Sequence, residues 1–358
     1  MKPPYRVPSM AEVRAVPSNG YRLVSTFSGA GGSCTGFRLA GFRALWASEF
    51  VASARETYAA NWPQTVLDGR DIRDVTPEEI LTATGGEIDV LEGSPPCSSF
   101  SMAGKREAGW GIVKPYSGER SQRTDDLFAE YARLVRGIQP RIFVAENVAG
   151  LTRGKAVGYF RQITADLRAA GYAVESRLLD AQWLGVPQVR SRLFILGVRD
   201  DLYAAGVRHI WPVPLPFRYG TGEALADVPA PHGVTGAVTG RVTLGENEAP
   251  ALAGYALDQD WLRGARYINT SRGSLSAPLG TVTALGGSSV GIASVVHPTE
   301  RRKFSIRELK ALCSYPADYV LCGTYAEQWE RLGRSVPPLM ARAVAECVRA
   351  MLDAGRTA

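Results

Sequence analysis

Short, largely apolar segments alternate with stretches of helical spacing along the first two hundred residues. The segments typical of strands fall at 21–27, 42–48, 65–67, 88–92, 141–145, 173–179 and 193–197. The helical patterns that separate many of them fall at 35–40, 51–61, 125–137 and 159–170. This alternation predicts an α/β fold built on a doubly wound sheet, in which the carboxyl ends of the strands form the ligand-binding edge.

The pattern changes after residue 200. Residues 211–255 contain many Pro and Gly residues and little periodicity, and no strand–helix–strand unit is expected before residue 296. A smaller, irregular domain is therefore inserted into the first one. We expect four parts: an N-terminal arm outside the fold at 1–20, the sheet domain at 21–200, the irregular domain at 201–295, and a segment at 296–358 that returns to the sheet domain.

A cysteine lies on a stiff turn directly after the strand expected at 88–92. Pro95 and Pro96 cannot continue a strand or enter a helix interior, so the backbone turns sharply before Cys97. A thiol at the carboxyl end of a strand lies where open α/β sheets bind ligands. The alternative is a buried, inert cysteine, which is the common state of a free thiol. The two prolines and the small hydroxyl residues after Cys97 favour a nucleophile.

A glycine-rich turn, Ser28-Gly-Ala-Gly-Gly-Ser33, follows the first expected strand. Its glycines let the backbone approach a ligand closely, with the amides of the next helix directed at it. Glu49 ends the second strand, where a carboxylate binds a ribose 2′-hydroxyl in nucleotide-binding sheets. Asp71 follows the third strand, where it can accept a hydrogen bond from an adenine amine or cap a turn.

A long loop, 98–124, follows the cysteine. Its basic residues and one tryptophan are Lys105, Arg106, Trp110, Lys114, Arg120 and Arg123. A loop of this length in a compact domain is usually functional, and this composition suits a lid that closes on nucleic acid. The alternative is a solvated surface loop.

Three more charged residues lie at strand ends. Glu146 follows the strand at 141–145, where a carboxylate is unlike an ordinary surface charge. Arg190 and Arg192 alternate at the start of the last strand expected in this half, 193–197, so an extended backbone would place both guanidinium groups on one face.

Composition limits the class of protein. The net charge of +6 and the isoelectric point near 9.1 are compatible with a polyanionic partner. Five cysteines, without CxxC spacing, favour a reducing cytoplasm over a disulfide framework, and three scattered histidines predict no metal site. The sequence has no apolar run of membrane-spanning length and no signal-peptide pattern at its start.

The order of these features resembles the conserved motifs of the DNA cytosine-C5 methyltransferases. The matching segments are 27–32, 47–49, 71–72, 95–97, 146–148, 188–192 and 333–336, and the resemblance covers nearly all of 21–352. It implies the Rossmann-like, doubly wound sheet of S-adenosylmethionine-dependent methyltransferases, with a target-recognition domain at 201–295. It also implies methyl transfer to a cytosine that is flipped out of duplex DNA.

The resemblance assigns roles to individual residues. Cys97 would add to C6 of the cytosine, Glu146 would act at N3 and the exocyclic amine, and Arg192 would bind O2, with Arg190 as a partner that orients Glu146 or the backbone. The implied cofactor-binding residues are Phe27, Ser28, Gly29, Gly31, Gly32, Glu49, Phe50, Asp71, Ile72, Pro96, Arg334, Ser335 and Val336. The implied DNA-binding residues are Ser98, Ser101, Lys105, Arg106, Arg123, Thr281 and Thr283. We expect a cytoplasmic monomer in a bacterial or phage-infected cell, without membrane or metal, and with a cognate restriction endonuclease as a candidate partner.

Three positions depart from the family pattern. Ser98 stands where many members have Gln after the cysteine, and Ser25-Thr26 stands where many have Asp-Leu before Phe27. Arg334 stands where the last motif usually has Asn. Arg334 can turn outward, pair with a carboxylate such as Glu49, or contact a DNA phosphate. Alternatively, it can hold the carboxylate of a carboxylated S-adenosylmethionine (carboxy-S-adenosylmethionine), so that the product is 5-carboxymethylcytosine.

Two further alternatives concern the substrate and the activity. A related branch of the family modifies cytosine in tRNA, but the recognition region here is large and that branch's Cys-Phe-Thr tripeptide is absent. A non-catalytic binder with the same fold is the other alternative. The presence of Cys97, Glu146 and Arg192 together argues against it.

Overall fold

The chain divides into two compact units. The sheet unit comprises Val16–Leu179, Ser191–Pro212 and Arg342–Ala358, and the second unit comprises Met1–Ala15, Asp180–Arg190 and Val213–Ala341. The computed structural model describes residues 2–96, 114–115, 121–122, 126–154, 156–235, 243–250, 271–287, 295–300 and 302–357. Among the helices of these residues, none combines the length and the hydropathy needed to span a bilayer.

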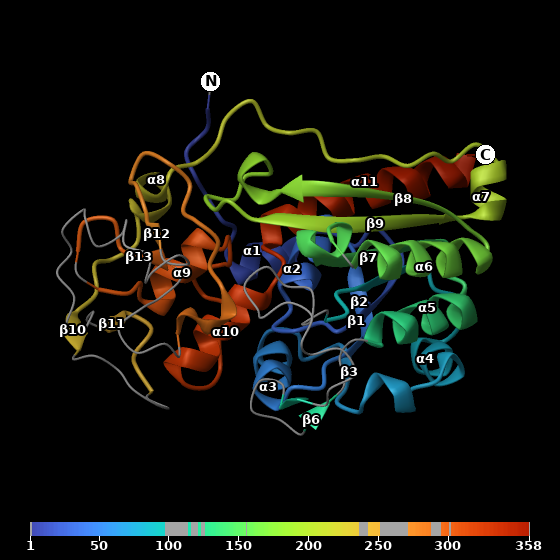
Figure 1. Cartoon of the computed structure of the whole chain (residues 1–358), viewed down its shortest axis with the longest axis horizontal. Coiled ribbons are helices and arrows are strands. Elements are labelled where there is room, and N and C mark those ends of the chain that lie inside the picture. The colour runs from blue at the N-terminus through green and yellow to red at the C-terminus, as the bar shows by residue number, and fades with distance from the viewer. Residues whose placement is uncertain are drawn as a thin grey trace. The chain divides into compact units, whose positions relative to one another are not determined.

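A seven-stranded sheet organises the sheet unit (Figure 1). In spatial order its strands are β3 (Val66–Asp68), β2 (Arg43–Ser48), β1 (Arg22–Thr26), β4 (Val90–Gly93), β7 (Ile142–Val148), β9 (Ser191–Arg199) and β8 (Tyr172–Asp180). Neighbours from β3 to β7 are parallel, and β9 runs antiparallel to β7. The strand order reverses between β1 and β4, and their carboxyl ends form the switch point at which doubly wound sheets bind ligands.

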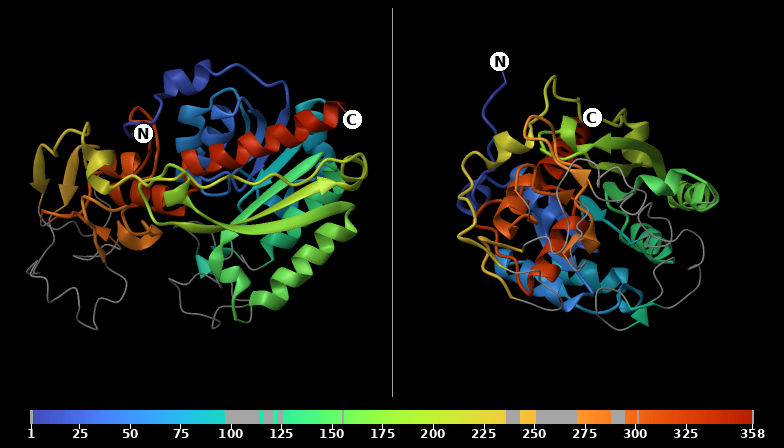
Figure 2. Two further views of the ribbon diagram at one scale, coloured as in Figure 1. Left: turned by 90° about the horizontal axis from the view of Figure 1, so that it is seen from above. Right: turned by 60° about the vertical axis from the view of Figure 1, so that its left-hand side comes forward.

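Helices cover both faces of this sheet (Figure 2). One face carries α4 (Pro77–Thr84), α5 (Leu127–Ile138) and α6 (Ala156–Ala169). The other face carries α2 (Gly32–Leu39), α3 (Ala52–Asn61) and the C-terminal part of α11 (Pro338–Thr357). The remaining short elements of this unit are η1 (Ile72–Asp74), β5 (Lys114–Pro115), β6 (Ser121–Gln122), η3 (Ala149–Thr152) and α7 (Asp200–Ala204).

The core of the sheet unit is built by helical spacing on one side and strand residues on the other. In α5, Leu127, Tyr131 and Leu134 recur at spacings of three and four, so one apolar stripe faces the sheet. The ring of Tyr131 meets that of Phe143 edge to face, at a centroid distance of 6.3 Å. On the neighbouring strand, Gly197 lies opposite Phe143, and a Cβ at residue 197 would come within 1.9 Å of the ring. This position therefore requires glycine.

The second unit contains short helices and small sheets. Its elements are α1 (Met10–Ala15), η4 (Ala181–Trp183), α8 (Thr221–Leu225), β10 (Gly233–Thr235), β11 (Glu248–Pro250), β12 (Ser271–Arg272), η7 (Ala284–Gly286), β13 (Val295–Val296), α9 (Ile306–Leu312), α10 (Tyr325–Arg334) and the first turn of α11. The fully buried Trp329 of α10 packs against η7 and donates a hydrogen bond from Nε1 to the carbonyl oxygen of Thr283, at 2.9 Å. Helix packing of this kind gives the unit a core of its own.

The unit boundaries differ from those expected from the sequence. The predicted arm at 1–20 is partly packed, because α1 buries Met10 and Val13, three residues apart on one face of the helix. The backbone amide of Met10 also donates to Asp318 at 2.8 Å. The predicted insert at 201–295 corresponds to a longer region, Val213–Ala341, because α9 and α10 pack on α8 and η7 within the second unit.

Candidate active site

The glycine-rich turn at the end of β1 has an unusual backbone. Phe27, Gly29 and Gly31 have positive φ angles of 52°, 55° and 81°, and Gly31 is the N-cap of α2. Positive φ is rare for a residue such as Phe27, and strain of this kind is concentrated at ligand sites. A Cβ added at Gly29 would meet no described atom within 4 Å, so the turn is open on that side.

Glu49 is fixed beside this turn. Its Oε2 accepts the backbone amide of Gly29 at 2.8 Å, and its Oε1 accepts that of Val51, also at 2.8 Å. A carboxylate oxygen can accept more than one hydrogen bond, so both oxygens can still receive a hydroxyl from a ligand. The structure brings Glu49, Phe50 and the turn together at the carboxyl end of β1 and β2, as the sequence predicts.

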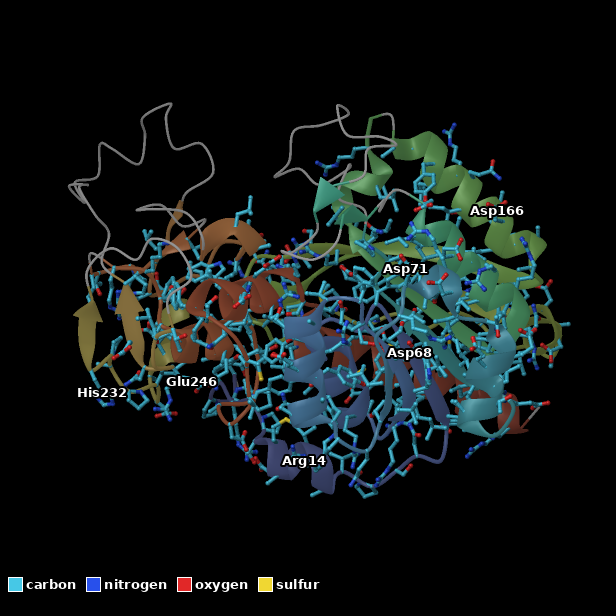
Figure 3. All side chains as sticks on the ribbon, turned by 90° about the horizontal axis from the view of Figure 1, so that it is seen from below. Arg14, Asp68, Asp71, Asp166, His232 and Glu246 are labelled. Carbon is cyan, nitrogen blue, oxygen red and sulfur yellow. The ribbon has the colours of Figure 1, made fainter. Side chains whose placement is uncertain are left out.

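Asp71 caps the turn that follows β3 (labelled in Figure 3). Its Oδ1 accepts the backbone amide of Arg73 at 3.1 Å, and its Oδ2 pairs with the Arg73 guanidinium at 3.0 Å. Of the two roles considered for Asp71, the cap is therefore present in the structure. Ile72, the first residue of η1, is buried.

The carboxyl end of β7 and the amino end of β9 bring a second carboxylate and an arginine together. Because β9 is antiparallel to β7, Arg192 lies opposite Val148, next to Glu146. Arg192 Nε and Glu146 Oε1 are 3.0 Å apart, and both side chains are largely buried. Burial lowers the pKa of Arg192 from its ordinary value, while the negative charge of Glu146 opposes that shift. The pair is thus a charged, preoriented group at the edge of the sheet.

Asn147 connects this pair to the turn that leads to Cys97. Its Nδ2 donates to the carbonyl oxygen of Pro95 at 3.1 Å, and its Oδ1 accepts the amide of Val148 at 2.8 Å. Asn147 belongs to the segment 146–148 that resembles a family motif, but no role was predicted for it. This hydrogen bond holds the Pro95-Pro96 backbone against the end of β7.

Arg190 and Arg192 have different partners. The Arg190 guanidinium donates to the carbonyl oxygens of Val282 at 3.1 Å and Gly333 at 2.8 Å, all within the second unit. Strand β9 begins at Ser191, so the two-residue alternation assumed for the pair does not extend back to Arg190. In this structure Arg190 binds backbone carbonyls and holds the segment before Arg334.

The other predicted residues of the second unit have partners inside it. Thr281 donates from Oγ1 to the carbonyl oxygen of Val189 at 2.6 Å, and the carbonyl oxygen of Thr283 accepts Trp329 Nε1. Arg334, at the end of α10, pairs with Glu330 (Nε–Oε1, 2.7 Å). Ser335 caps α10, and Val336 is buried.

A buried carboxylic acid that the sequence analysis did not assign also lies at this edge. Glu92, on β4, is 3% exposed and accepts hydrogen bonds from Ser25 and Ser33. Burial raises the pKa of Glu92 to about 7, and the negative charge of Glu146 adds to that shift. The only sequence signal was its place as the terminal carboxylate of a strand.

Several predicted residues lie outside the described part of the chain, namely Cys97, Ser98, Ser101, Lys105, Arg106 and Arg123. Cys97 is the residue that follows Pro96, the last described residue of the segment after β4.

Comparison with known proteins decides the family. The family model described as C-5 cytosine-specific DNA methylase matches residues 21–233 and 244–349. The chain belongs to this family. It is 32% identical over 346 residues to the type II methyltransferase M1.HphI of Haemophilus parahaemolyticus, covering 92% of this chain and 86% of that one. It is 30% identical over 359 residues to M.Eco47II of Escherichia coli, covering 94% and 81%.

Solved structures agree with the fold of a C-5 cytosine methylase. A prophage-encoded E. coli protein described as a DNA modification methyltransferase has a TM-score of 0.73 at 19% identity, over 93% of this chain and all of that one. The Dnmt2 methyltransferase of S. pombe has a TM-score of 0.61 at 15% identity, over 93% and 98%. At these identities the likeness concerns the fold alone, and the predicted methyltransferase sheet is confirmed.

The chain is therefore a DNA cytosine-C5 methyltransferase that uses S-adenosylmethionine. The residues at the switch point fit this cofactor. The turn after β1 is open at Gly29, and Glu49 is held with both oxygens directed by backbone amides. Glycine turns before a helix and a carboxylate after the second strand are the elements that bind a nucleoside in doubly wound sheets.

Proposed function

We propose that this methylase acts on duplex DNA through a covalent adduct between Cys97 and C6 of a flipped-out cytosine. The observation that carries the proposal is the junction at the end of β7, where Glu146 pairs with Arg192 and Asn147 binds Pro95, two residues before Cys97. Glu146, Arg192 and the backbone of Pro95 are thereby held at one strand end.

The reactivity of cytosine determines the role of each of these groups. Cytosine C5 is a weak nucleophile, and addition of the Cys97 thiolate at C6 converts the ring to an enamine with a nucleophilic C5. Glu146 protonates N3 or hydrogen-bonds to it as negative charge enters the ring. Arg192 donates hydrogen bonds to O2 and stabilises the negative charge that develops there. S-adenosylmethionine, when bound, supplies the electrophilic methyl group, and loss of the C5 proton to a base then expels the Cys97 thiolate from C6. The cytosine must leave the helix because C6 is attacked perpendicular to the ring.

Glu146→Gln tests the role at N3. Gln can still accept a hydrogen bond but cannot deliver a proton, so we expect kcat to fall by roughly a hundred- to ten-thousand-fold. Cofactor affinity, measured by calorimetry, should be unchanged. A variant that retains wild-type kcat would contradict the role of Glu146.

For the cofactor we propose a site formed by residues of the sheet unit, namely Phe27, Ser28, Gly29, Gly31, Gly32, Glu49, Phe50, Asp71, Ile72 and Pro96. A cofactor role for Arg334, Ser335 and Val336, which belong to the second unit, stays a prediction from the resemblance. Glu49 would bind the ribose and Asp71 the adenine amine. The Arg73 pair uses only part of the Asp71 carboxylate, because each oxygen can accept more than one donor.

For DNA we propose contacts from Ser98, Ser101, Lys105, Arg106, Arg123, Thr281 and Thr283. The type II names of the relatives support a place in restriction–modification, with a cognate endonuclease as partner. We further propose a cytoplasmic monomer, since a single chain carries all the predicted site residues. Affinity for duplex DNA should fall steeply with salt, as expected for phosphate contacts.

Arg334 supports a second candidate, carboxymethyl transfer from carboxy-S-adenosylmethionine. A guanidinium replaces the usual Asn, and it stays partly exposed, at 36%, although it pairs with Glu330. The Glu330 carboxylate balances this cation, which favours the ordinary cofactor, and methyl is the group we propose. If the carboxylated cofactor were used, Arg334 would hold its carboxylate.

Mass spectrometry of nucleosides distinguishes the two candidates. The wild type, Arg334→Asn and the control Arg342→Asn are each supplied with both cofactors. Arg342 pairs with Glu346 at the same helical spacing as Arg334 with Glu330. We expect 5-methylcytosine from the wild type and from both variants. Carboxymethylcytosine from wild type and the Arg342 control, lost in Arg334→Asn, would establish the second candidate.

A further inference from the structure

Glu92 lies in a buried hydroxyl network beneath the glycine-rich turn. Its Oε1 accepts a hydrogen bond from Ser25 Oγ at 2.5 Å, and its Oε2 accepts one from Ser33 Oγ at 2.9 Å. Cys34 Sγ lies 3.7 Å from Oε1, and Ser28 Oγ lies 2.7 Å from Ser25 Oγ. One carboxyl group therefore joins residues from both ends of the turn.

The sheet register explains how this network forms. Ser25 on β1 and Glu92 on β4 are direct neighbours on parallel strands, next to the carboxyl ends of both. Ser33 belongs to the first turn of α2, directly after the turn. The network thus fixes the end of β1 and the start of α2 to the same side chain. Its location is the switch point at which the methylase binds its cofactor.

The charge of Glu92 has no cationic partner within the part of the chain that the structure describes. Its side-chain donors there are two hydroxyls and a thiol, all neutral. Among the described residues, the titratable groups that interact electrostatically with Glu92 are acids: Glu146 from β7, which itself pairs with Arg192, Cys34 from α2 with a pKa of about 12, and Tyr131 from α5, whose pKa is raised well above its ordinary value by burial. Tyr58 of α3 donates to the Cys34 sulfur.

A buried carboxylate without a cation is costly to the folded protein and is uncommon outside functional sites. The cofactor carries a permanent positive charge on its sulfonium sulfur, and the demethylated product does not. A cation bound at the switch point would stabilise an ionised Glu92, whereas a neutral thioether would not. Burial raises the pKa of Glu92 to about 7, so a cation bound nearby can shift the ionisation of this carboxyl group at neutral pH.

We propose that Glu92 is a positioning residue of the cofactor site that favours the sulfonium cofactor over its thioether product. In this chain it supplies, from β4, the carboxylate that many family members carry as Asp at the position of Ser25. The proposal rests on the use of S-adenosylmethionine by this methylase. Glu92 supports the glycine-rich turn through Ser25 and Ser33, and its negative charge discriminates between the sulfonium cofactor and the neutral thioether product.

Calorimetry on the purified full chain without DNA tests the proposal directly. S-adenosylmethionine and S-adenosylhomocysteine are titrated at pH 7 in two buffers of different ionisation enthalpy, which reports the protons released on binding. We expect wild type to release protons with the sulfonium ligand and not with the thioether. In Glu92→Gln that release should disappear, and the ratio of the two affinities should shift by roughly tenfold towards the product.

Two further variants separate charge from folding. Asp89→Asn removes a carboxylate at the amino end of β4, where Asp89 pairs with Arg141. This variant should leave the ratio of the two ligand affinities unchanged. The double variant Ser25→Asp/Glu92→Gln returns the carboxylate to the family's position and should restore both the ratio and the proton release. If Glu92→Gln unfolds, the double variant alone decides.

The outcomes are distinct. An unchanged affinity ratio and unchanged proton release in Glu92→Gln would overturn the role of Glu92, as would a double variant that folds but restores neither. Wild-type protein that binds S-adenosylmethionine with the predicted proton release, yet leaves cytosine in DNA unmodified, would instead contradict the proposed function and leave the role of Glu92 supported.

Discussion

Two buried glutamates in this methylase have opposite surroundings. Glu308, in the second unit, is 4% exposed and pairs with the Arg302 guanidinium through two hydrogen bonds, of 2.7 and 2.8 Å, while its Oε2 also accepts the Ser305 amide. Glu92, in the sheet unit, is equally buried but is surrounded by neutral hydroxyls. The first carboxylate is neutralised inside its own unit, and the second is left for a ligand to neutralise. Burial alone therefore does not mark a functional acid; the charge of its partners does.

The Glu146–Arg192 pair at the edge of the sheet is intermediate between the paired Glu308 and Glu92, which has no cationic partner among the described residues. Glu146 has a cationic partner, Arg192, but the pair lies at a strand end beside the backbone that leads to Cys97. Arg302 shows what an interior pair does instead. Burial lowers the pKa of Arg302, yet the hydrogen bonds to Glu308 and Glu300 outweigh it and raise the pKa above its ordinary value.

The largest expected effect on stability comes from breaking the interior pair. Arg302→Met keeps most of the side-chain volume and leaves Glu308 buried without its guanidinium partner. We expect the free energy of unfolding to fall by about 3–5 kcal/mol, because the uncompensated charge stays buried. Urea unfolding monitored by fluorescence measures it. A loss below about 1 kcal/mol would remove the contrast between Glu308 and Glu92.

The next effect concerns Glu92 and pH. Its folded-state pKa, about 7, is above the ordinary value of 4.5, so the unfolded chain loses its proton first as pH rises. The stability contribution is therefore fully present below about pH 4.5 and is lost progressively up to about pH 7, by roughly 3 kcal/mol. Unfolding free energies measured across this range in wild type and Glu92→Gln should differ by this slope. Parallel curves for the two proteins would contradict the assignment.

The smallest effect is expected from an exposed pair. Arg342 and Glu346 are 2.8 Å apart on α11, each more than 40% exposed. Arg342→Ala should change the free energy of unfolding by no more than about 0.5 kcal/mol, and adding salt should reduce the difference further. Thermal unfolding at low and high salt provides the measurement. A loss of unfolding free energy comparable to that of Arg302→Met would contradict the dependence on burial.

Much of the sheet unit follows from the sequence, because strand and helix periods and the residues after each strand are local signals. Glu49, Glu146 and the glycine-rich turn were predicted at strand ends and lie there. Arg190 and Arg192 were predicted to share a face; strand β9 begins only at Ser191, and the two residues bind different partners. Glu92 was missed because its partners Ser25 and Ser33 are 67 and 59 residues away in the chain. Pairing across strands of this kind has no signature in local spacing.

The N-terminal segment shows a second limit. Proline-rich, polar residues predicted an arm, yet the hydroxyl of Tyr5 donates to the carbonyl oxygen of Ala311 at 2.6 Å, and α1 buries Met10 and Val13. Two buried residues in a six-residue helix are too few for a periodic pattern, so only the tertiary partner determines that they are buried.

Trapping with duplex DNA that contains 5-fluorocytosine tests the central claim most directly, because fluorine at C5 blocks the final proton loss and preserves the adduct. With S-adenosylmethionine present, wild-type protein should form a complex that survives denaturation, and peptide mapping should place the cross-link on Cys97. Cys347→Ala is the control: burial raises the pKa of that thiol to about 11, so it should not contribute. Cys97→Ala should form no complex. The absence of a complex with wild type, or a cross-link on another residue, would contradict the account.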